Sequence, residues 1–127
     1  MTDHVKTDVA EGIMTLTLTR PDKKNALSKA MYSAMSDGLE RAERDADVGV
    51  VLFQGDGDSF TAGNDLADFS AASNGSNPGP NEANRFISNL GKATKPMIAA
   101  CRISTRSARK RYHAMARSVP RKLVVRN

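Results

Sequence analysis

The segment Phe60–Leu66, Phe-Thr-Ala-Gly-Asn-Asp-Leu, carries the residue types best suited to chemistry in this chain. It follows a turn-forming stretch, and the spacing of Leu66 and Phe69 predicts that a short helix opens near Asn64. The first N–H groups of a helix have no intrahelical acceptor, and the helix dipole favours negative charge there. Gly63 would let a substrate approach the backbone closely. The segment is therefore a candidate oxyanion-binding turn, and the alternative is an ordinary strand-to-helix connection with small residues for packing.

The elements before this turn show clear periodicity. Apolar residues alternate with threonines over 12–19, which predicts a half-buried strand that ends at Arg20-Pro21. Ser28 is a candidate N-cap for a helix over 29–44. The apolar stripe of that helix consists of Met31, Met35, Leu39 and Ala42.

The later elements complete an alternating pattern. Val48–Phe53 is a continuous apolar run, which favours a strand buried on both faces of a parallel sheet. Residues 71–81 are rich in Ser, Asn, Gly and Pro and predict a flexible loop. A helix is expected over 82–92 and a buried strand from residue 97 to 100. The resulting order of strand, helix, strand, helix, helix, strand is typical of an α/β fold.

Four segments, in order along the chain, resemble the crotonase superfamily of enoyl-CoA hydratases and isomerases. Phe60–Leu66 is similar to the oxyanion-hole motif of that family. The other three matching segments are Ile13–Ser28, Val48–Gly55 and Lys95–Ala100. The resemblance covers residues 5–100, and it implies the N-terminal portion of the crotonase (ClpP/crotonase) ββα spiral fold, an incomplete α/β domain.

The resemblance also implies an activity and a set of site residues. Its members bind an acyl-CoA thioester as substrate, need no further cofactor or metal, and stabilise an enolate or thioester oxyanion with two backbone N–H groups. By position, the first donor is the amide of Asn64. The positions that match CoA-binding segments are Lys24, Ala26, Leu27, Ala62, Gly63, Asp65 and Leu66. Alternatively, Lys24 is a solvated surface charge and Asp65 a first-turn acid that stabilises the helix dipole.

The chain departs from the family pattern after Ala100. Residues 101–127 contain nine Lys and Arg, with no Asp, Glu or Gly, so the second oxyanion turn and the acid–base residues of the family have no counterpart there. We interpret 1–100 as a partial crotonase-like domain and 101–127 as a basic non-family tail, either frameshifted or disordered. A spliced or genuinely short variant is the alternative. Without those groups, the 127-residue chain is expected to lack hydratase activity.

Composition limits the remaining possibilities. A chain of 13.7 kDa has room for one small domain, and a single cysteine excludes an intramolecular disulfide framework. No apolar run approaches the roughly 20 residues of a membrane span, and the N-terminus has no apolar signal region, so a cytoplasmic location without membrane contact is expected. Family relatives are oligomers, but the segments that mediate their assembly have no match in this chain.

The charge of the chain is unevenly placed and suggests a second function. Residues 1–100 carry 10 basic and 14 acidic side chains, whereas residues 101–127 carry a net charge of +9. Such a tail could neutralise phosphates on nucleic acid. Only one aromatic residue, Tyr112, is available in it for base stacking, so nucleic-acid binding is the less favoured alternative to an acyl-CoA enzyme. Salt-dependent retention on DNA without CoA affinity would support it.

The frameshift interpretation predicts what the coding DNA contains. Seven arginines in 27 residues is a composition typical of GC-rich DNA read out of frame, so another frame is expected to resume the family pattern after Ala100. Translation of the other two frames downstream of that codon should give a glycine-rich turn and, further on, acidic residues. If neither frame continues the family, the interpretation is wrong.

Overall fold

The computed structural model describes residues 2–73 and 81–101. The predicted tail from residue 102 onward, with Tyr112, lies outside the described residues. Strands and helices alternate along the described part of the chain, as predicted. Their bounds are β1 Val5–Ala10, β2 Ile13–Leu18, the 3-10 helix η1 Pro21–Lys23, α1 Lys29–Arg44, β3 Val50–Gly55, α2 Leu66–Ser73, α3 Glu82–Lys92 and β4 Met97–Ala100.

The four strands form one mixed sheet in the order β1-β2-β3-β4. β1 and β2 make an antiparallel hairpin in which Val9 lies opposite Met14. β2 pairs with β3 in parallel, and β3 pairs with β4 in parallel. The sequence analysis missed β1, because its exposed residues outnumber its half-buried ones and its apolar alternation is short. The predicted parallel pairs are confirmed, and right-handed helical crossovers are what such pairs require.

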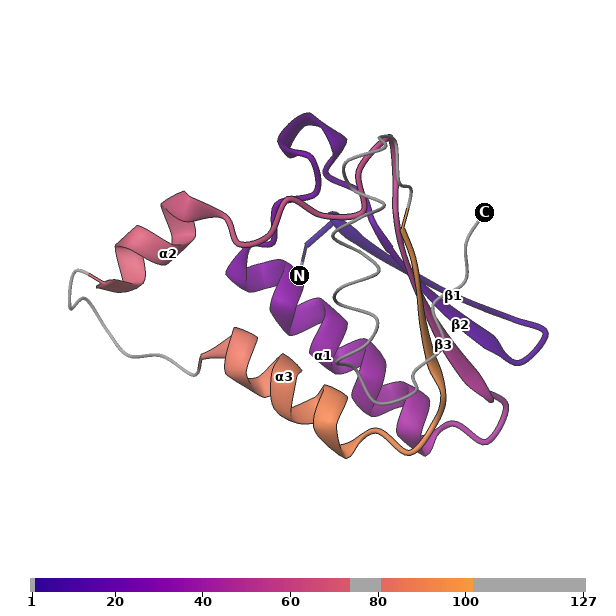
Figure 1. The fold of residues 1–127 in the computed structure, drawn as a ribbon. Helices are drawn as coiled ribbons and strands as arrows, with labels where there is room; N and C mark the ends of the chain where they lie inside the picture. The colour runs from indigo at the N-terminus through magenta and orange to yellow at the C-terminus, as the bar shows by residue number, and fades with distance from the viewer. Residues whose placement is uncertain (1, 74–80, 102–127) are drawn as a thin grey trace, which may run out of the picture.

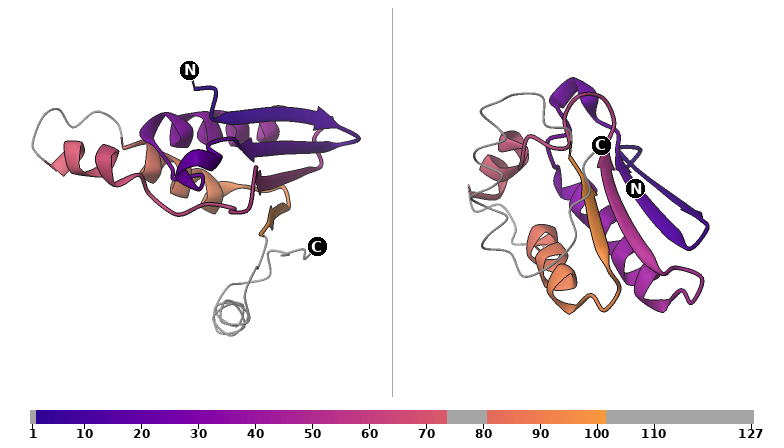
Figure 2. Two further views of the ribbon diagram at one scale, coloured as in Figure 1. Left: turned by 90° about the horizontal axis from the view of Figure 1, so that it is seen from above. Right: turned by 45° about the vertical axis from the view of Figure 1, so that its right-hand side comes forward.

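α1 and α3 form the helical layer, and they lie side by side (Figures 1 and 2). The predicted stripe of α1 is confirmed, since all four of its residues are buried. Ser28 caps α1 as predicted, because its hydroxyl accepts a hydrogen bond from the N–H of Met31. The apolar core is Met14, Leu16, Leu18, Met31, Met35, Leu39, Ala42, Val48, Val51, Phe53 and Met97.

Ion pairs and caps join α3 and the turn after it to α1. Arg85 of α3 contacts Asp37 at 2.7 Å and Glu40 at 2.9 Å, both on α1. After α3, the hydroxyl of Thr94 donates to Glu43, and the ammonium of Lys95 donates to carbonyl groups at the C-terminal end of α1. These polar contacts fix α3 beside α1 and deliver the chain to the start of β4.

Two expectations from the sequence need correction. The β3 segment is not buried on both faces: Val51 and Phe53 are buried against the helices, whereas Val50 and Leu52 are only half-buried. Among the described residues, helices cover one face of this sheet, so alternate side chains differ in burial. The predicted bounds of the loop over 71–81 are wrong, because α2 extends to Ser73 and the side chain of Asn81 caps α3. Residues 74–80 lie outside the described part.

A test of the helix–sheet packing comes from the two helical glycines. A Cβ added at Gly38 of α1 would lie 2.8 Å from Cδ2 of the fully buried Leu16, whereas one at Gly91 of α3 would meet nothing within 4 Å. Gly91→Ala is expected to stabilise the fold by about 0.5–1 kcal/mol through helix propensity. Gly38→Ala is expected to destabilise it by about 1 kcal/mol, because overpacking outweighs the same propensity gain. Urea unfolding followed by circular dichroism measures both, and equal stabilities would contradict the packing argument.

Candidate functional site

All eight residues that the sequence analysis singled out lie on two segments that pair with each other. The N–H of Leu27 donates to the carbonyl of Gly63 at 2.7 Å, and the N–H of Asp65 donates to the carbonyl of Leu27 at 2.9 Å. A third bond joins the N–H of Ala62 to the carbonyl of Lys24 at 2.9 Å. The connection between β2 and α1 therefore lies beside the connection between β3 and α2. Residues 37 positions apart in sequence, Leu27 and Asn64, face each other in a parallel pair.

Asn25 fastens these two connections together, and it is fully buried. Its carboxamide nitrogen donates to the carbonyls of Asp56 at 2.9 Å and Ser59 at 2.7 Å. Its carboxamide oxygen accepts from the N–H of Arg20 at 2.8 Å. The backbone of Asn25 is left-handed, with φ of 55°, a conformation that asparagine tolerates better than most residues. One side chain thus satisfies three backbone groups that have few other partners within reach.

A glycine at the end of β3 allows the chain to fold back toward Asn25. A Cβ at Gly55 would lie 2.4 Å from the carbonyl oxygen of Ser59 and 2.6 Å from that of Phe60. Since these neighbours are backbone atoms, no side-chain rotation could relieve the clash. The close approach at Gly55 therefore brings the carbonyl of Ser59 to the carboxamide of Asn25.

The pairing with Leu27 determines which amides of the Ala62–Asp65 segment are free. The amides of Ala62 and Asp65 bond to backbone carbonyls, and the amide of Gly63 donates to the hydroxyl of Thr61 at 3.1 Å. In a parallel pair the central residue of one strand bonds to the residues before and after its partner, so the partner's own N–H points to the other side. Within 62–65, only the amide of Asn64 has no hydrogen bond to a residue that the structure describes. It points away from Leu27.

Asp65 is held in place by an ion pair. Nη1 of Arg20 lies 2.7 Å from Oδ2 of Asp65, with less than a fifth of either side chain exposed, and 3.2 Å from the carbonyl of Ala26. The hydrogen bond from Arg20, with a second from the N–H of Ala67, lowers the pKa of Asp65. This carboxylate therefore stays ionised at neutral pH. Its ion pair anchors the loop, and its negative charge lies directly before α2, where the helix dipole favours it.

The N-terminal part of α1 contacts the same loop. The N–H of Lys29, at the start of α1, donates to Oδ2 of Asp68 at 2.9 Å. The hydroxyl of Tyr32 donates to the side-chain oxygen of Asn64. The sequence analysis predicted neither contact. It also missed Asn25 and the ion pair of Arg20, because no local pattern signals a partner 30 to 45 residues away.

The predicted CoA-binding positions differ in exposure. Lys24 and Ala62 are exposed, Leu66 keeps 81% of its surface open to solvent, and Ala26 and Leu27 are half-buried. The two segments that carry them come together near the N-terminal end of α1 (Figure 1). An exposed apolar side chain and an exposed basic one suit a ligand with an apolar part and a charged part.

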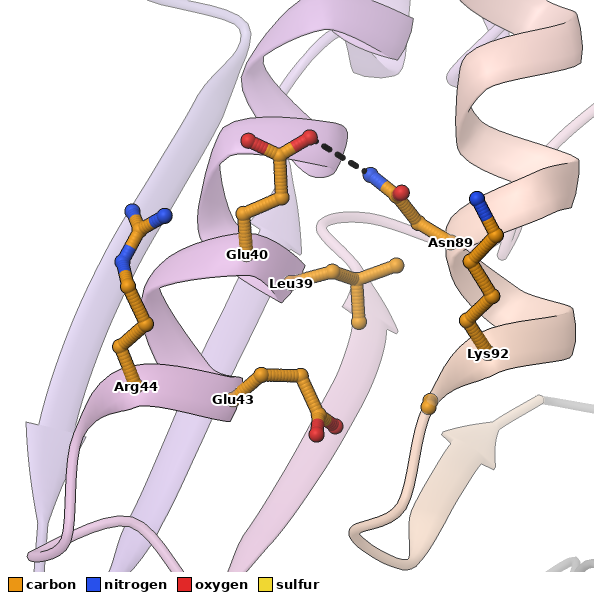
Figure 3. Close-up of a pocket in the computed structure, with 7 residues that line it drawn as sticks. Leu39, Glu40, Glu43, Arg44, Asn89 and Lys92 are labelled. Carbon is orange, nitrogen blue, oxygen red and sulfur yellow. Dashed lines mark hydrogen bonds between the residues drawn. The ribbon is translucent and has the colours of Figure 1, made fainter.

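A separate groove of about 220 Å³ lies between α1 and α3 (Figure 3), and it contains none of the predicted site residues. Its carboxylates already have partners. Glu40 accepts hydrogen bonds from Asn89 and Arg85, and Glu43 accepts them from Thr94 and Lys95, which lowers the pKa of both carboxyl groups. The groove is therefore part of the helix packing. Among the described residues, no group of three or more His, Cys, Asp and Glu side chains could hold a metal ion, and no helix is long and apolar enough to cross a membrane.

Comparisons with known proteins place this arrangement in a family. Residues 8–104 match the family model described as Enoyl-CoA hydratase/isomerase. The chain is 32% identical over 105 residues to 1,2-epoxyphenylacetyl-CoA isomerase from Escherichia coli, covering 79% of this chain and 40% of that protein. It is also similar to the solved structure of an enoyl-CoA hydratase/isomerase from Pseudoalteromonas atlantica, with a TM-score of 0.70, 33% identity, and coverage of 78% of this chain and 38% of that one.

The chain belongs to the enoyl-CoA hydratase/isomerase family. A second solved structure, an enoyl-CoA hydratase from Mycobacterium marinum, has a TM-score of 0.69 and 35% identity over 77% of this chain and 47% of its own. The predicted family and the predicted incomplete crotonase fold are confirmed. The chain spans about two-fifths of the length of the E. coli relative, and the matched residues include the whole of the paired segments.

Substitutions at Asn25 test what holds the paired segments together. Asn25→Ala takes away the side-chain partner of three backbone groups and puts alanine in a left-handed conformation, so it is expected to cost about 3 kcal/mol of folding free energy. Asn25→Gly loses the same hydrogen bonds without the conformational strain, and it is expected to be about 1 kcal/mol more stable than the alanine variant. Urea unfolding compares the two. A loss below about 0.5 kcal/mol in Asn25→Ala would show that the side chain does not hold the connections.

Proposed function

We propose that this chain binds an acyl-CoA thioester and presents the backbone N–H of Asn64 to its carbonyl oxygen as one donor of an oxyanion hole. The observation that carries the proposal is the Leu27–Asn64 pairing, which leaves this amide without an acceptor and directs it away from its partner segment. An amide held in this way needs no reorganisation when negative charge develops on a thioester oxygen. Relatives such as 1,2-epoxyphenylacetyl-CoA isomerase act on CoA thioesters.

The residues around Asn64 supply the CoA-binding part of the proposal. Lys24, Ala26 and Leu27 would line one side of the CoA, and Ala62, Gly63, Asp65 and Leu66 the other. Gly63 supports this because its φ of 95° and the open space at its Cβ position let a ligand approach the backbone. The exposed ammonium of Lys24 suits a phosphate, and the exposed side chain of Leu66 suits an apolar ligand group.

We propose hydration or isomerisation of a 2-enoyl-CoA as the reaction of the full family machinery, and no turnover by these 127 residues alone. The carboxylates nearest to Asn64 in sequence are already engaged, because Asp65 pairs with Arg20 and Asp68 accepts from the N–H of Lys29. Each of them therefore already has a structural contact in the loop. Lack of one oxyanion donor costs about 10²–10³ in rate, and lack of the acid–base groups costs about 10²–10⁴ more.

Nuclear magnetic resonance tests the donor directly. The ¹⁵N-labelled chain is titrated with acetoacetyl-CoA, whose enolate shares its negative charge with the thioester oxygen. The amide proton of Asn64 is expected to move downfield. The amides of Ala62 and Asp65 serve as internal controls, because their hydrogen bonds to Lys24 and Leu27 are already made. If acetoacetyl-CoA binds and the Asn64 signal stays in place while other site signals shift, Asn64 is not the donor.

An activity assay tests the second part of the proposal. Hydration of crotonyl-CoA by the same sample is expected to equal that of a heat-treated control. Turnover clearly above that control would mean that the chain holds an acid–base pair which the proposal does not assign.

A further inference from the structure

Tyr32 of α1 connects the apolar core to the loop that carries Asn64. Its hydroxyl donates to the side-chain oxygen of Asn64, a residue 32 positions later in the sequence. Its ring lies 5.7 Å from the ring of Phe86 at an angle of 55°, and Phe86 in turn makes an edge contact with Phe53 of β3 at 6.0 Å. A row of three aromatic rings thus runs from the sheet, through α3, to the hydroxyl that contacts Asn64. Rings packed in this way leave the hydroxyl little freedom to move.

The two hydrogen bonds on either side of Asn64 do not by themselves fix the direction of its N–H. The two hydrogen bonds to Leu27 define a line along the backbone, and rotation about this line would change the direction of the Asn64 N–H. Gly63 offers little resistance, since its φ is 95° and nothing lies within 4 Å of its Cβ position. The side chain of Asn64 projects out of the plane of the paired backbones, so a hydrogen bond to it acts away from that line and opposes the rotation.

We propose that Tyr32 is a positioning residue for the oxyanion donor: by holding the side chain of Asn64, it fixes the direction in which the Asn64 N–H points. The expected effect of Tyr32 on acyl-CoA binding rests on the proposed function. Its effect on the direction of the Asn64 N–H does not require a ligand. Burial raises the pKa of Tyr32, so the hydroxyl keeps its proton and remains a donor at neutral pH. Phenylalanine at this position would keep the ring contacts and lose the hydrogen bond alone.

The test compares Tyr32→Phe with Thr17→Val, a control that also removes one side-chain hydrogen bond. The hydroxyl of Thr17 accepts from Gln54 at 3.0 Å within the sheet and has no contact with the Asn64 loop. In Tyr32→Phe the backbone order parameter of Asn64 is expected to fall from the rigid value of about 0.85 toward 0.6. The affinity for acetoacetyl-CoA is expected to fall about fivefold, the factor typical of one neutral hydrogen bond, whereas affinity for CoA without an acyl group stays within about twofold. Thr17→Val is expected to change none of the three.

A second substitution shows whether Tyr32 acts through Asn64. Asn64→Ala removes the acceptor and keeps the backbone N–H, so adding Tyr32→Phe to it should cause no further loss of acetoacetyl-CoA affinity. An unchanged order parameter in Tyr32→Phe, or the same loss of affinity in both backgrounds, would overturn the proposal. If the unaltered chain binds no acyl-CoA, the proposed function fails, and the order parameter of Asn64 still decides whether Tyr32 holds the loop.

Discussion

The buried carboxamide of Asn25 is the interaction on which the candidate site depends. It forms hydrogen bonds with backbone groups of two connections. These are the N–H of Arg20 after β2 and the carbonyls of Asp56 and Ser59 after β3. Because this side chain is fully buried, its carboxamide depends on these three backbone groups for its hydrogen bonds. Once these two connections are joined, Leu27 lies opposite Asn64, and the pattern of backbone hydrogen bonds around the site follows.

The same loop is also tied to the helical layer. Arg20 reaches Asp65, the first N–H of α1 reaches Asp68, and Tyr32 reaches Asn64. One contact comes from the connection after β2 and two come from α1, and all three reach a segment whose backbone is conformationally free at Gly63. A preorganised amide requires this kind of support, since a donor that must rotate into place loses much of its electrostatic advantage.

Several carboxylates of the described residues are engaged in structural contacts, both in the loop that carries Asn64 and between the helices. The pKa values of Asp65, Glu40 and Glu43 are lowered by their partners. A group held ionised in this way is a poor general acid at neutral pH. This distribution agrees with a chain that matches about two-fifths of the length of its E. coli relative.

Periodicity along the chain was enough to predict α1, α3 and β2, together with the buried residues of α1 and β2, because amphipathic patterns report local burial. The motif Phe60–Leu66 and three further segments indicated the family through their residue types and order alone. The sequence did not reveal β1, the one-sided burial of β3, or the roles of Asn25, Arg20 and Tyr32. The strand β1 has too short an apolar alternation to be recognised. The three side chains depend on partners distant in sequence: hydrogen bonds of Asn25 and Tyr32 span 31 to 34 residues, and the ion pair of Arg20 spans 45. Local patterns record which face of an element is apolar, whereas the free amide of Asn64 exists only because the tertiary structure places Leu27 beside it.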